Sequence, residues 1–235
     1  MAWHCKATGG YTTSSPVYNY PDSDGQDNCL EIYGILAGLG WTLNAVCGLL
    51  TCAAFESGYN PWRYEGNLIQ STSSIDSFGY GYGLLQWTPA SDTYTNNPGL
   101  NKYINNTHST GIRGYGPNFS DQPGSSFDGY AQMHYLDSYG YVGQYFYNSS
   151  YPAYAAVAPT FSQYKASTAS AADLAECWVV NFERPGNPGN NRTLRNALAA
   201  ALYSWLSGVP VPTPSQPGGF PVWLLFKMRE ENFKR

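Results

Sequence analysis

One carboxylate stands alone in a long apolar stretch of the sequence. Between Glu31 and Arg63 the only charged residue is Glu56, in the segment CAAFESGYNPW. An ionised carboxylate is costly among apolar side chains, so its pKa rises when it is desolvated. A carboxylic acid that keeps its proton near neutral pH is the group that general acid catalysis requires. Glu56 is therefore the first candidate for a catalytic acid, and a solvated side chain at a helix end is the alternative.

The element that positions Glu56 is a predicted helix over residues 43–57. Thr42 is a favourable N-cap residue, and Gly58 supplies the left-handed conformation that ends many helices. The helix is apolar nearly all round, which predicts a central place in the core. At its last turn the helix dipole disfavours a further negative charge, which also raises the expected pKa of Glu56.

The remaining pattern predicts a predominantly helical α+β fold in one main domain. Apolar spacing predicts further helices from 27 or 28 to about 39 and over 127–140, 173–182 and 192–206. Alternating Gly and aromatic residues before position 88 predict a short hairpin, and a long polar loop follows over 89–126. We expect a loop or arm over 1–27, the catalytic domain over 28–207, and a Pro/Gly linker with a docking tail over 208–235.

Composition excludes several classes of function. Charged residues are 12% of the chain, aromatic residues are 16%, and the net charge is −4, which does not favour binding to nucleic acid. No segment is apolar enough to span a membrane, and the first residues lack the features of a secretory signal. The three histidines are far apart, so we expect no metal site, and no nucleotide-binding motif indicates a cofactor.

The five cysteines have no metal-ligand spacing. We expect most of them to be buried free thiols. A bond between Cys5 and Cys29 is the alternative for those two, if the N-terminal segment folds back.

Three blocks of the sequence carry a specific resemblance. FESGYNPWRYEGN, GYGYGLLQWTPAS and CWVVNFERPGNPG occur in this order and resemble the lysozyme-like domain of phage tail-tip enzymes that degrade peptidoglycan, found in short-tailed phages. The resemblance implies a lysozyme-like fold with a small β-hairpin lining the cleft. It also implies that Glu56 is the catalytic acid and that glycan strands of peptidoglycan are the substrate.

Cleavage of a glycosidic bond also needs a group that holds water or offsets the positive charge of the transition state. Glu65 lies nine residues after Glu56, the spacing that phage-type lysozymes use for their second acid. Asp76 precedes the expected hairpin and is the competing candidate. Both alternatives stay open from the sequence, as does a solvated role for each.

The second block also supplies the candidate sugar-binding residues. GLLQW is similar to a block that lines the sugar cleft in goose-type lysozymes and lytic transglycosylases, and the neighbouring glycines allow close approach of a ligand or of other backbone. These candidates are Tyr80, Tyr82, Gln86 and Trp87, with packing within the hairpin as the alternative for the tyrosines. Glu183 and Arg184 in the third block are expected to form a buried structural pair behind the cleft.

The expected protein is a muramidase carried in the virion, on a phage tail, which acts outside the host cell on the wall during entry. Its expected partners are peptidoglycan and other phage tail proteins. A lytic transglycosylase is the close alternative, because that reaction needs one acid and no second carboxylate. A structural or receptor-binding tail protein with an inactive lysozyme fold is the alternative from a different class.

Overall fold

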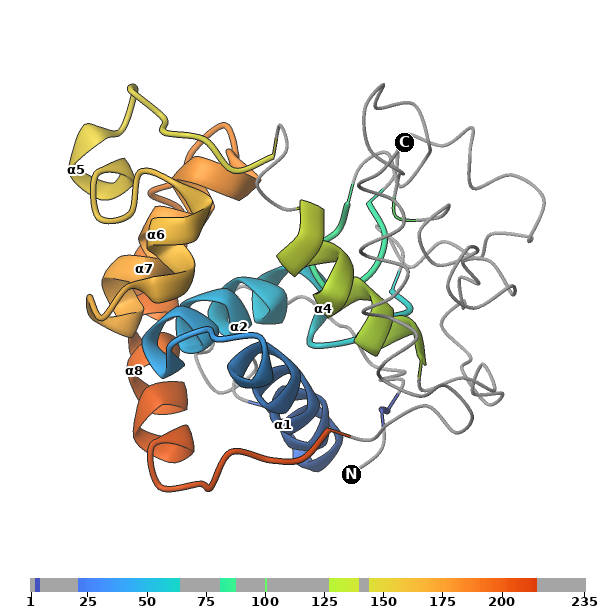
Figure 1. The fold of residues 1–235 in the computed structure, drawn as a ribbon. Coiled ribbons are helices and arrows are strands. Elements are labelled where there is room, and N and C mark those ends of the chain that lie inside the picture. Colours follow the sequence, from blue (N-terminus) through green and yellow to red (C-terminus); the bar gives the residue numbers. More distant parts are fainter. Residues whose placement is uncertain are drawn as a thin grey trace, which may run out of the picture.

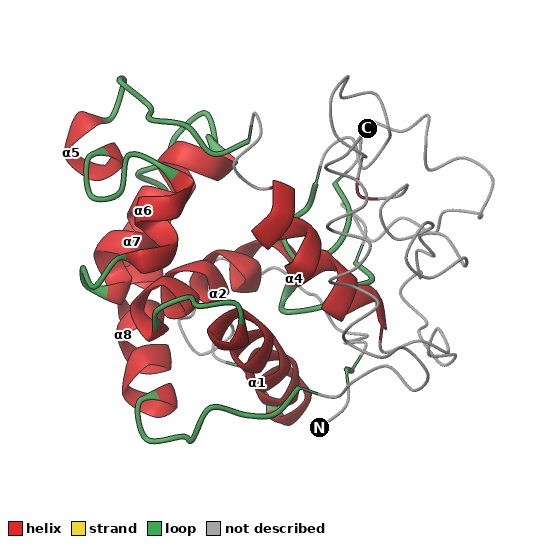
Figure 2. Ribbon diagram, in the orientation of Figure 1, coloured by secondary structure: helices red, strands yellow, loops and turns green. Residues whose placement is uncertain are grey.

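The computed structural model describes residues 3–4, 21–63, 81–87, 100, 127–139 and 144–214 of the 235-residue chain. Its helices are α1 (Ser23–Gly38), α2 (Leu43–Ser57), α4 (Phe127–Tyr139), α5 (Pro152–Ala155), α6 (Phe161–Ala166), α7 (Ala171–Trp178), the π-helix η4 (Val179–Glu183) and α8 (Arg192–Leu206). Figure 2 shows helices joined by loops in this part of the chain, with no strand drawn there. The helical character is confirmed for the described residues.

Helix α2 is the centre of the packing. It contacts α1, α6, α7 and α8, while α1 also packs on α4 and α7 packs on α8 (Figure 1). The close approach to α7 depends on Gly48, where a Cβ would lie 2.6 Å from the hydroxyl of Tyr164 and 2.9 Å from Cβ of Leu174. Nearly every side chain from Ala45 to Ala54 is buried as a result. The predicted central helix is confirmed.

The caps of α2 explain why its bounds match the prediction. The Thr42 hydroxyl accepts a hydrogen bond from the backbone N–H of Ala45 at 3.2 Å and donates one to the carbonyl of Ser167 at 2.5 Å. At the other end Gly58 is left-handed (φ 60°, ψ 36°), and its N–H bonds to the carbonyl of Ala54 at 3.1 Å. Local chemistry at both termini therefore fixes the helix.

Helix α1 begins earlier than the apolar spacing predicts. Asp22 is its N-cap and accepts a hydrogen bond from the N–H of Gly25 at 2.9 Å. The first turn is polar and carries no apolar stripe, so periodicity alone misses it. The described residues before α1 lie against this helix and α4: the N–H of His4 bonds to Oδ1 of Asn28 at 2.7 Å, and Trp3 packs on Gly129.

The predicted helix over 173–182 is two elements in the structure. Ser170 caps α7, which becomes η4 at Val179 and ends at Arg184, a left-handed residue whose N–H bonds to the carbonyl of Val179 at 2.7 Å. The wider turn places Asn181 inside the core, where its amide donates to the carbonyl of Ala158 at 3.2 Å and its oxygen accepts from the N–H of Asn148 at 3.0 Å. The π-turn thus holds the segment around residue 148.

The expected β-hairpin is not shown in the described residues. They contain one isolated antiparallel bridge, between Tyr82 and Trp87, with N–H to carbonyl distances of 3.1 and 3.0 Å. The loop between these residues turns through Gly83 (φ 81°) and Gln86 (φ 47°). Such a short loop leaves no room for extended residues inside the bridge. Positions 64–80, which precede this loop, lie outside the described residues.

Helix α8 has the predicted bounds, and the chain after it runs back to α1 (Figure 1). The described part of the predicted linker contacts the first helix at Gly34, where a Cβ would lie 2.6 Å from the carbonyl oxygen of Pro212. The prediction of buried cysteines is confirmed for Cys47, Cys52 and Cys177, which are free thiols. None of the described helices is long and apolar enough to cross a membrane.

Candidate active site

Glu56 lies in the last turn of α2, between the half-buried Phe55 and the buried Ser57. The residue is half-buried, whereas its neighbours one turn back, Cys52 and Ala53, are buried. Burial raises the pKa of the Cys52 thiol, and the charges of Glu183 and Glu56 raise it further. The position of Glu56 at the end of a buried helix is therefore as predicted, with a second acidic residue nearby.

Ser57 ties the end of α2 to the loop over 81–87. Its hydroxyl lies 3.1 Å from the carbonyl of Ala53 in its own helix and 3.0 Å from the carbonyl of Leu84 in the loop. The loop is also held by Arg63, whose carbonyl accepts a hydrogen bond from the N–H of Gly83 at 2.8 Å. The segments on both sides of Glu56 are thus joined to the GLLQW block.

The predicted sugar-binding residues of this block make contacts within the protein. Gln86 donates hydrogen bonds from its side-chain amide to the carbonyls of Gly83 at 2.9 Å and Arg63 at 3.1 Å. Tyr82 is fully buried, and Trp87 is buried with its ring edge-on to Tyr135 at a centroid distance of 5.9 Å. Binding of sugar by these three residues stays a prediction. Tyr80 lies outside the described residues.

A buried glutamine in α4 completes the support of the loop. Gln132 accepts a hydrogen bond from the N–H of Leu84 at 2.8 Å and donates one to the carbonyl of Pro61 at 2.6 Å. Gly83 makes room for it, since a Cβ there would lie 2.5 Å from the glutamine oxygen. The sequence analysis did not select Gln132. A polar amide among the apolar positions of FDGYAQMHYLDSYG is the signal that indicates it.

Glu183 ends the π-helix η4, and its carboxyl group lies beside the ring of Trp178. Its Oε1 accepts a hydrogen bond from Nε1 of Trp178 at 3.0 Å. Some of the residue is exposed, but protein atoms surround its carboxyl group, and this burial raises its pKa well above the usual range. The charge of Glu56 raises the pKa further, while the Trp178 hydrogen bond and Arg184 act in the opposite direction.

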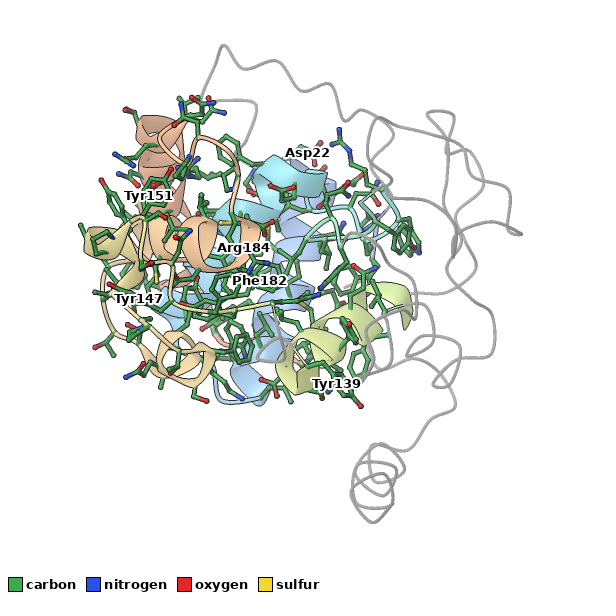
Figure 3. All side chains as sticks on the ribbon, turned by 90° about the horizontal axis from the view of Figure 1, so that it is seen from above. Asp22, Tyr139, Tyr147, Tyr151, Phe182 and Arg184 are labelled. Carbon is green, nitrogen blue, oxygen red and sulfur yellow. The ribbon has the colours of Figure 1, made fainter. Side chains whose placement is uncertain are left out.

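The expected buried pair of Glu183 and Arg184 is not what the structure has. Arg184 is an exposed residue, and its guanidinium carbon lies 4.1 Å from the ring centroid of Phe146. Figure 3 shows Phe182 and Arg184 on the turn after α7. The left-handed conformation of Arg184 ends the helix at this point, so consecutive side chains leave the turn in different directions. The prediction was wrong about the burial of Arg184.

The other two predicted acids, Glu65 and Asp76, lie outside the described residues. Within the described part of the chain, no group of three or more His, Cys, Asp and Glu side chains could hold a metal ion.

The comparison with protein families defines the class. The model of the phage tail lysozyme family matches residues 27–206, which include α1, Glu56, the GLLQW block and the helices up to α8. The chain belongs to the phage tail lysozyme family.

One individual relative is morphogenesis protein 1 of Bacillus phage B103. It is 29% identical to this chain over 181 residues, a match that covers 77% of this chain and 40% of the relative. The chain thus spans about two fifths of the length of that relative.

Proposed function

We propose that this protein is a phage tail-associated muramidase. In this proposal it hydrolyses the β-1,4 bond between N-acetylmuramic acid and N-acetylglucosamine in bacterial peptidoglycan. It does so from the virion, outside the host cell, during entry, together with other tail proteins. Membership of the phage tail lysozyme family supports the class of reaction. The single observation that carries the proposal is the half-buried carboxylate of Glu56 in the last turn of an otherwise buried helix.

The proposed mechanism assigns Glu56 as the general acid. It protonates the glycosidic oxygen while the bond to the anomeric carbon breaks through an oxocarbenium-like state. Glu65 and Asp76 are the proposed candidates for the group that holds water or offsets the positive charge. Tyr80, Tyr82, Gln86 and Trp87 are proposed to line the sugar site, and no metal or cofactor is required by this mechanism.

The proposal predicts that Glu56→Gln loses catalysis while it keeps the fold. The amide is close in shape to the acid but has no proton to donate, so kcat/KM should fall by about 10²- to 10⁴-fold. Release of soluble fragments from purified peptidoglycan measures the activity, and the thermal midpoint measures the fold. Asp173→Asn is the matched control, because it removes one carboxylate from an exposed position at the start of α7. Equal activity of Glu56→Gln and wild type would contradict the proposal.

Mass spectrometry of the products separates hydrolysis from transglycosylation. Hydrolysis leaves a reducing muramic end, whereas a lytic transglycosylase leaves a 1,6-anhydro end. Glu65→Gln and Asp76→Asn belong in the same experiment. If hydrolysis needs one of these carboxylates, the variant that lacks it should form less of the product with a reducing end, and the amount of 1,6-anhydro product should not change.

A structural role in the particle is a second candidate. The name of the phage B103 relative describes morphogenesis, and this favours a contribution to assembly. Phage carrying Glu56→Gln separates the two functions. Normal particles with impaired entry support the muramidase, while normal particles with normal entry support a purely structural role.

A further inference from the structure

Two neighbouring aromatic rings are exposed on the segment over 144–151. Among the described residues, the exposed large apolar side chains are Phe146 (48%), Tyr147 (42%), Tyr203 (39%) and Val211 (57%). Phe146 and Tyr147 are the adjacent pair in this set, and the exposed Ser149 and Ser150 follow them. Tyr147 lies toward the outer edge of the described structure in Figure 3. Exposed apolar side chains that gather beside polar ones are typical of a binding surface.

The backbone that carries the two rings is fixed to the π-helix η4. The N–H of Phe146 bonds to the carbonyl of Asn181 at 3.2 Å, and the N–H of Asn148 bonds to the side-chain oxygen of Asn181 at 3.0 Å. The side-chain amide of Asn148 also donates to the carbonyl of Val180 at 3.0 Å. Hydrogen bonds on both sides of Tyr147 therefore hold the two rings at the surface, and little ordering of this segment is needed when a ligand binds.

Arg184 joins this surface from the end of η4. Its guanidinium carbon lies 4.1 Å from the centroid of the Phe146 ring, and its backbone is left-handed (φ 52°, ψ 49°). A guanidinium stacked on a ring uses its flat face, and its N–H groups point outward in the plane in which carboxylates bind. Glu183, the preceding residue, directs a carboxyl oxygen to Nε1 of Trp178 at 3.0 Å. Arg184 thus places a positive charge beside the exposed ring.

The two segments that meet at this surface are poor in acidic residues. No Asp or Glu occurs over 138–172 or over 184–229, although the whole chain has a net charge of −4. Glu176, in α7, is buried and paired with Arg195 at 2.9 Å. An anionic ligand that approaches Arg184 therefore meets no carboxylate from either segment, and the local charge favours its binding.

An exposed ring beside an arginine fits a sugar polymer that carries carboxylates. One face of a sugar ring consists largely of C–H groups, which pack on an aromatic face. The peptide stems of peptidoglycan place carboxylates along the glycan strand, and arginine binds carboxylates with a defined geometry. A protein partner fits less well, because a specific interface covers about 800 Å² on each partner. Two aromatic side chains offer only roughly 150–250 Å² each.

We propose that Phe146, Tyr147 and Arg184 form a second contact surface for peptidoglycan, in which the rings pack on sugar and Arg184 binds a carboxylate of a peptide stem. This inference rests on the proposed function and extends it, because none of the predicted sugar-binding residues belongs to this surface. The contact holds the insoluble strand on the protein before and during cleavage. It therefore lowers the amount of substrate that the enzyme needs and leaves the bond-breaking step unchanged.

The first test measures binding to purified peptidoglycan from which teichoic acids have been removed. Every protein in this test carries Glu56→Gln, so that the substrate stays intact, and co-sedimentation gives the bound fraction. Phe146→Ala should weaken binding by about two- to tenfold, the range for one aromatic contact. Tyr203→Ala is the matched control, because it removes a ring of similar exposure from α8. Equal binding by these two variants would overturn the proposal.

Two further substitutions separate the ring from the stability of the fold. Phe146→Tyr keeps an aromatic ring, whereas Phe146→Leu keeps an apolar side chain without one. Binding should persist in the first and fall in the second, while the thermal midpoints of the two variants stay close together. Binding that follows the thermal midpoint, whether or not a ring is present, would show a purely structural residue and overturn the proposal.

Arg184→Gln tests the part of the proposal that concerns charge. Its binding should fall by about two- to fivefold at low salt, and the difference should shrink as salt is added. On peptidoglycan whose carboxyl groups have been converted to amides, Arg184→Gln should bind as well as its parent, while Phe146→Ala should still bind more weakly. A loss of equal size for Arg184→Gln on native and amidated peptidoglycan would overturn the contact with a carboxylate.

Protein with Glu56 intact separates this inference from the proposed function. Phe146→Ala should raise KM for peptidoglycan and leave kcat unchanged. Wild type that binds peptidoglycan through Phe146 but cleaves no glycosidic bond would overturn the proposed function and leave the surface established. Cleavage by wild type, with binding and KM unchanged in Phe146→Ala, would overturn the surface alone. Normal binding of Phe146→Ala to peptidoglycan, together with its loss from phage particles, would identify a protein partner and overturn the proposal.

Discussion

At the scale of single residues, buried polar side chains hold the segments on either side of Glu56. Gln132 joins α4 to the carbonyl of Pro61 and the N–H of Leu84, while Ser57 joins α2 to the carbonyl of Leu84. Within the described residues, no regular sheet joins these parts of the chain, so the hydrogen bonds of Gln132 and Ser57 connect them. The geometry around Glu56 therefore depends on a few amide and hydroxyl groups, and each of them can be tested by itself.

Gln132→Met should destabilise the protein strongly. Methionine has a similar length but makes neither hydrogen bond, so two backbone groups lose their partners at a combined cost of roughly 2 to 5 kcal/mol. Urea unfolding measures this change. Gln26→Met is the matched control, because Gln26 is only half-buried and donates one bond, to the carbonyl of Pro21 at 3.1 Å. An equal loss in both variants would contradict a special role for Gln132.

At the scale of elements, the change from α7 to η4 decides which side chains of this segment enter the core. The wider turn sends Asn181 into the core and ends at a left-handed Arg184. Glu183 then accepts from Trp178, one turn back, rather than following a regular helix to the surface. π-Turns inside helices are frequent at functional sites.

The sequence predicted the elements with strong local signals and missed those that depend on tertiary contacts. Thr42 and Gly58 determine α2 through their own capping bonds, so its bounds were predictable. The π-turn depends on the partners of Asn181, which come from distant segments and leave no periodic pattern. The raised pKa of Glu183 was missed for the same reason, because burial in the folded chain is its largest cause.

The pairing of α7 with α8 should depend on a buried ion pair. Arg195 lies 2.9 Å from Glu176, and both side chains are almost completely buried. Arg195→Met leaves the carboxylate without its main partner, so the free energy of unfolding should fall by about 3–5 kcal/mol. The double variant with Glu176→Met should lose less than the sum of the two single variants.

The control for this pair is Lys165→Met. It removes an ion pair with Asp137 at 2.7 Å, in which the lysine side chain is 27% exposed. Its loss should be smaller, about 1–2 kcal/mol, because the Asp137 carboxylate, which is 8% exposed, keeps the hydrogen bond from Nε1 of Trp41 at 2.8 Å. Equal losses from Lys165→Met and Arg195→Met, measured by chemical unfolding, would contradict the importance of burial.

At the scale of the whole molecule, we propose two separate roles for the chain after α8: a contact with α1 and docking to another protein. Residues 209–214 return to α1 and contact it through Pro212 and Gly34. The sequence beyond them, FPVWLLFKMREENFKR, combines an apolar run with a charged end. We propose that this later part is a docking tail for another phage tail protein, because an apolar strip after a linker is otherwise exposed.

Two truncations separate these roles. Deletion of 215–235 should keep the thermal midpoint and the cleavage of purified peptidoglycan, but it should abolish incorporation into phage particles. Deletion of 209–235 should also lower the thermal midpoint, because it uncovers the face of α1 at Gly34, which the carbonyl of Pro212 contacts in the structure. Differential scanning calorimetry and the protein content of purified particles are the measurements. Normal incorporation after deletion of 215–235 would contradict docking, and equal midpoints for the two truncations would contradict a stabilising contact at Gly34.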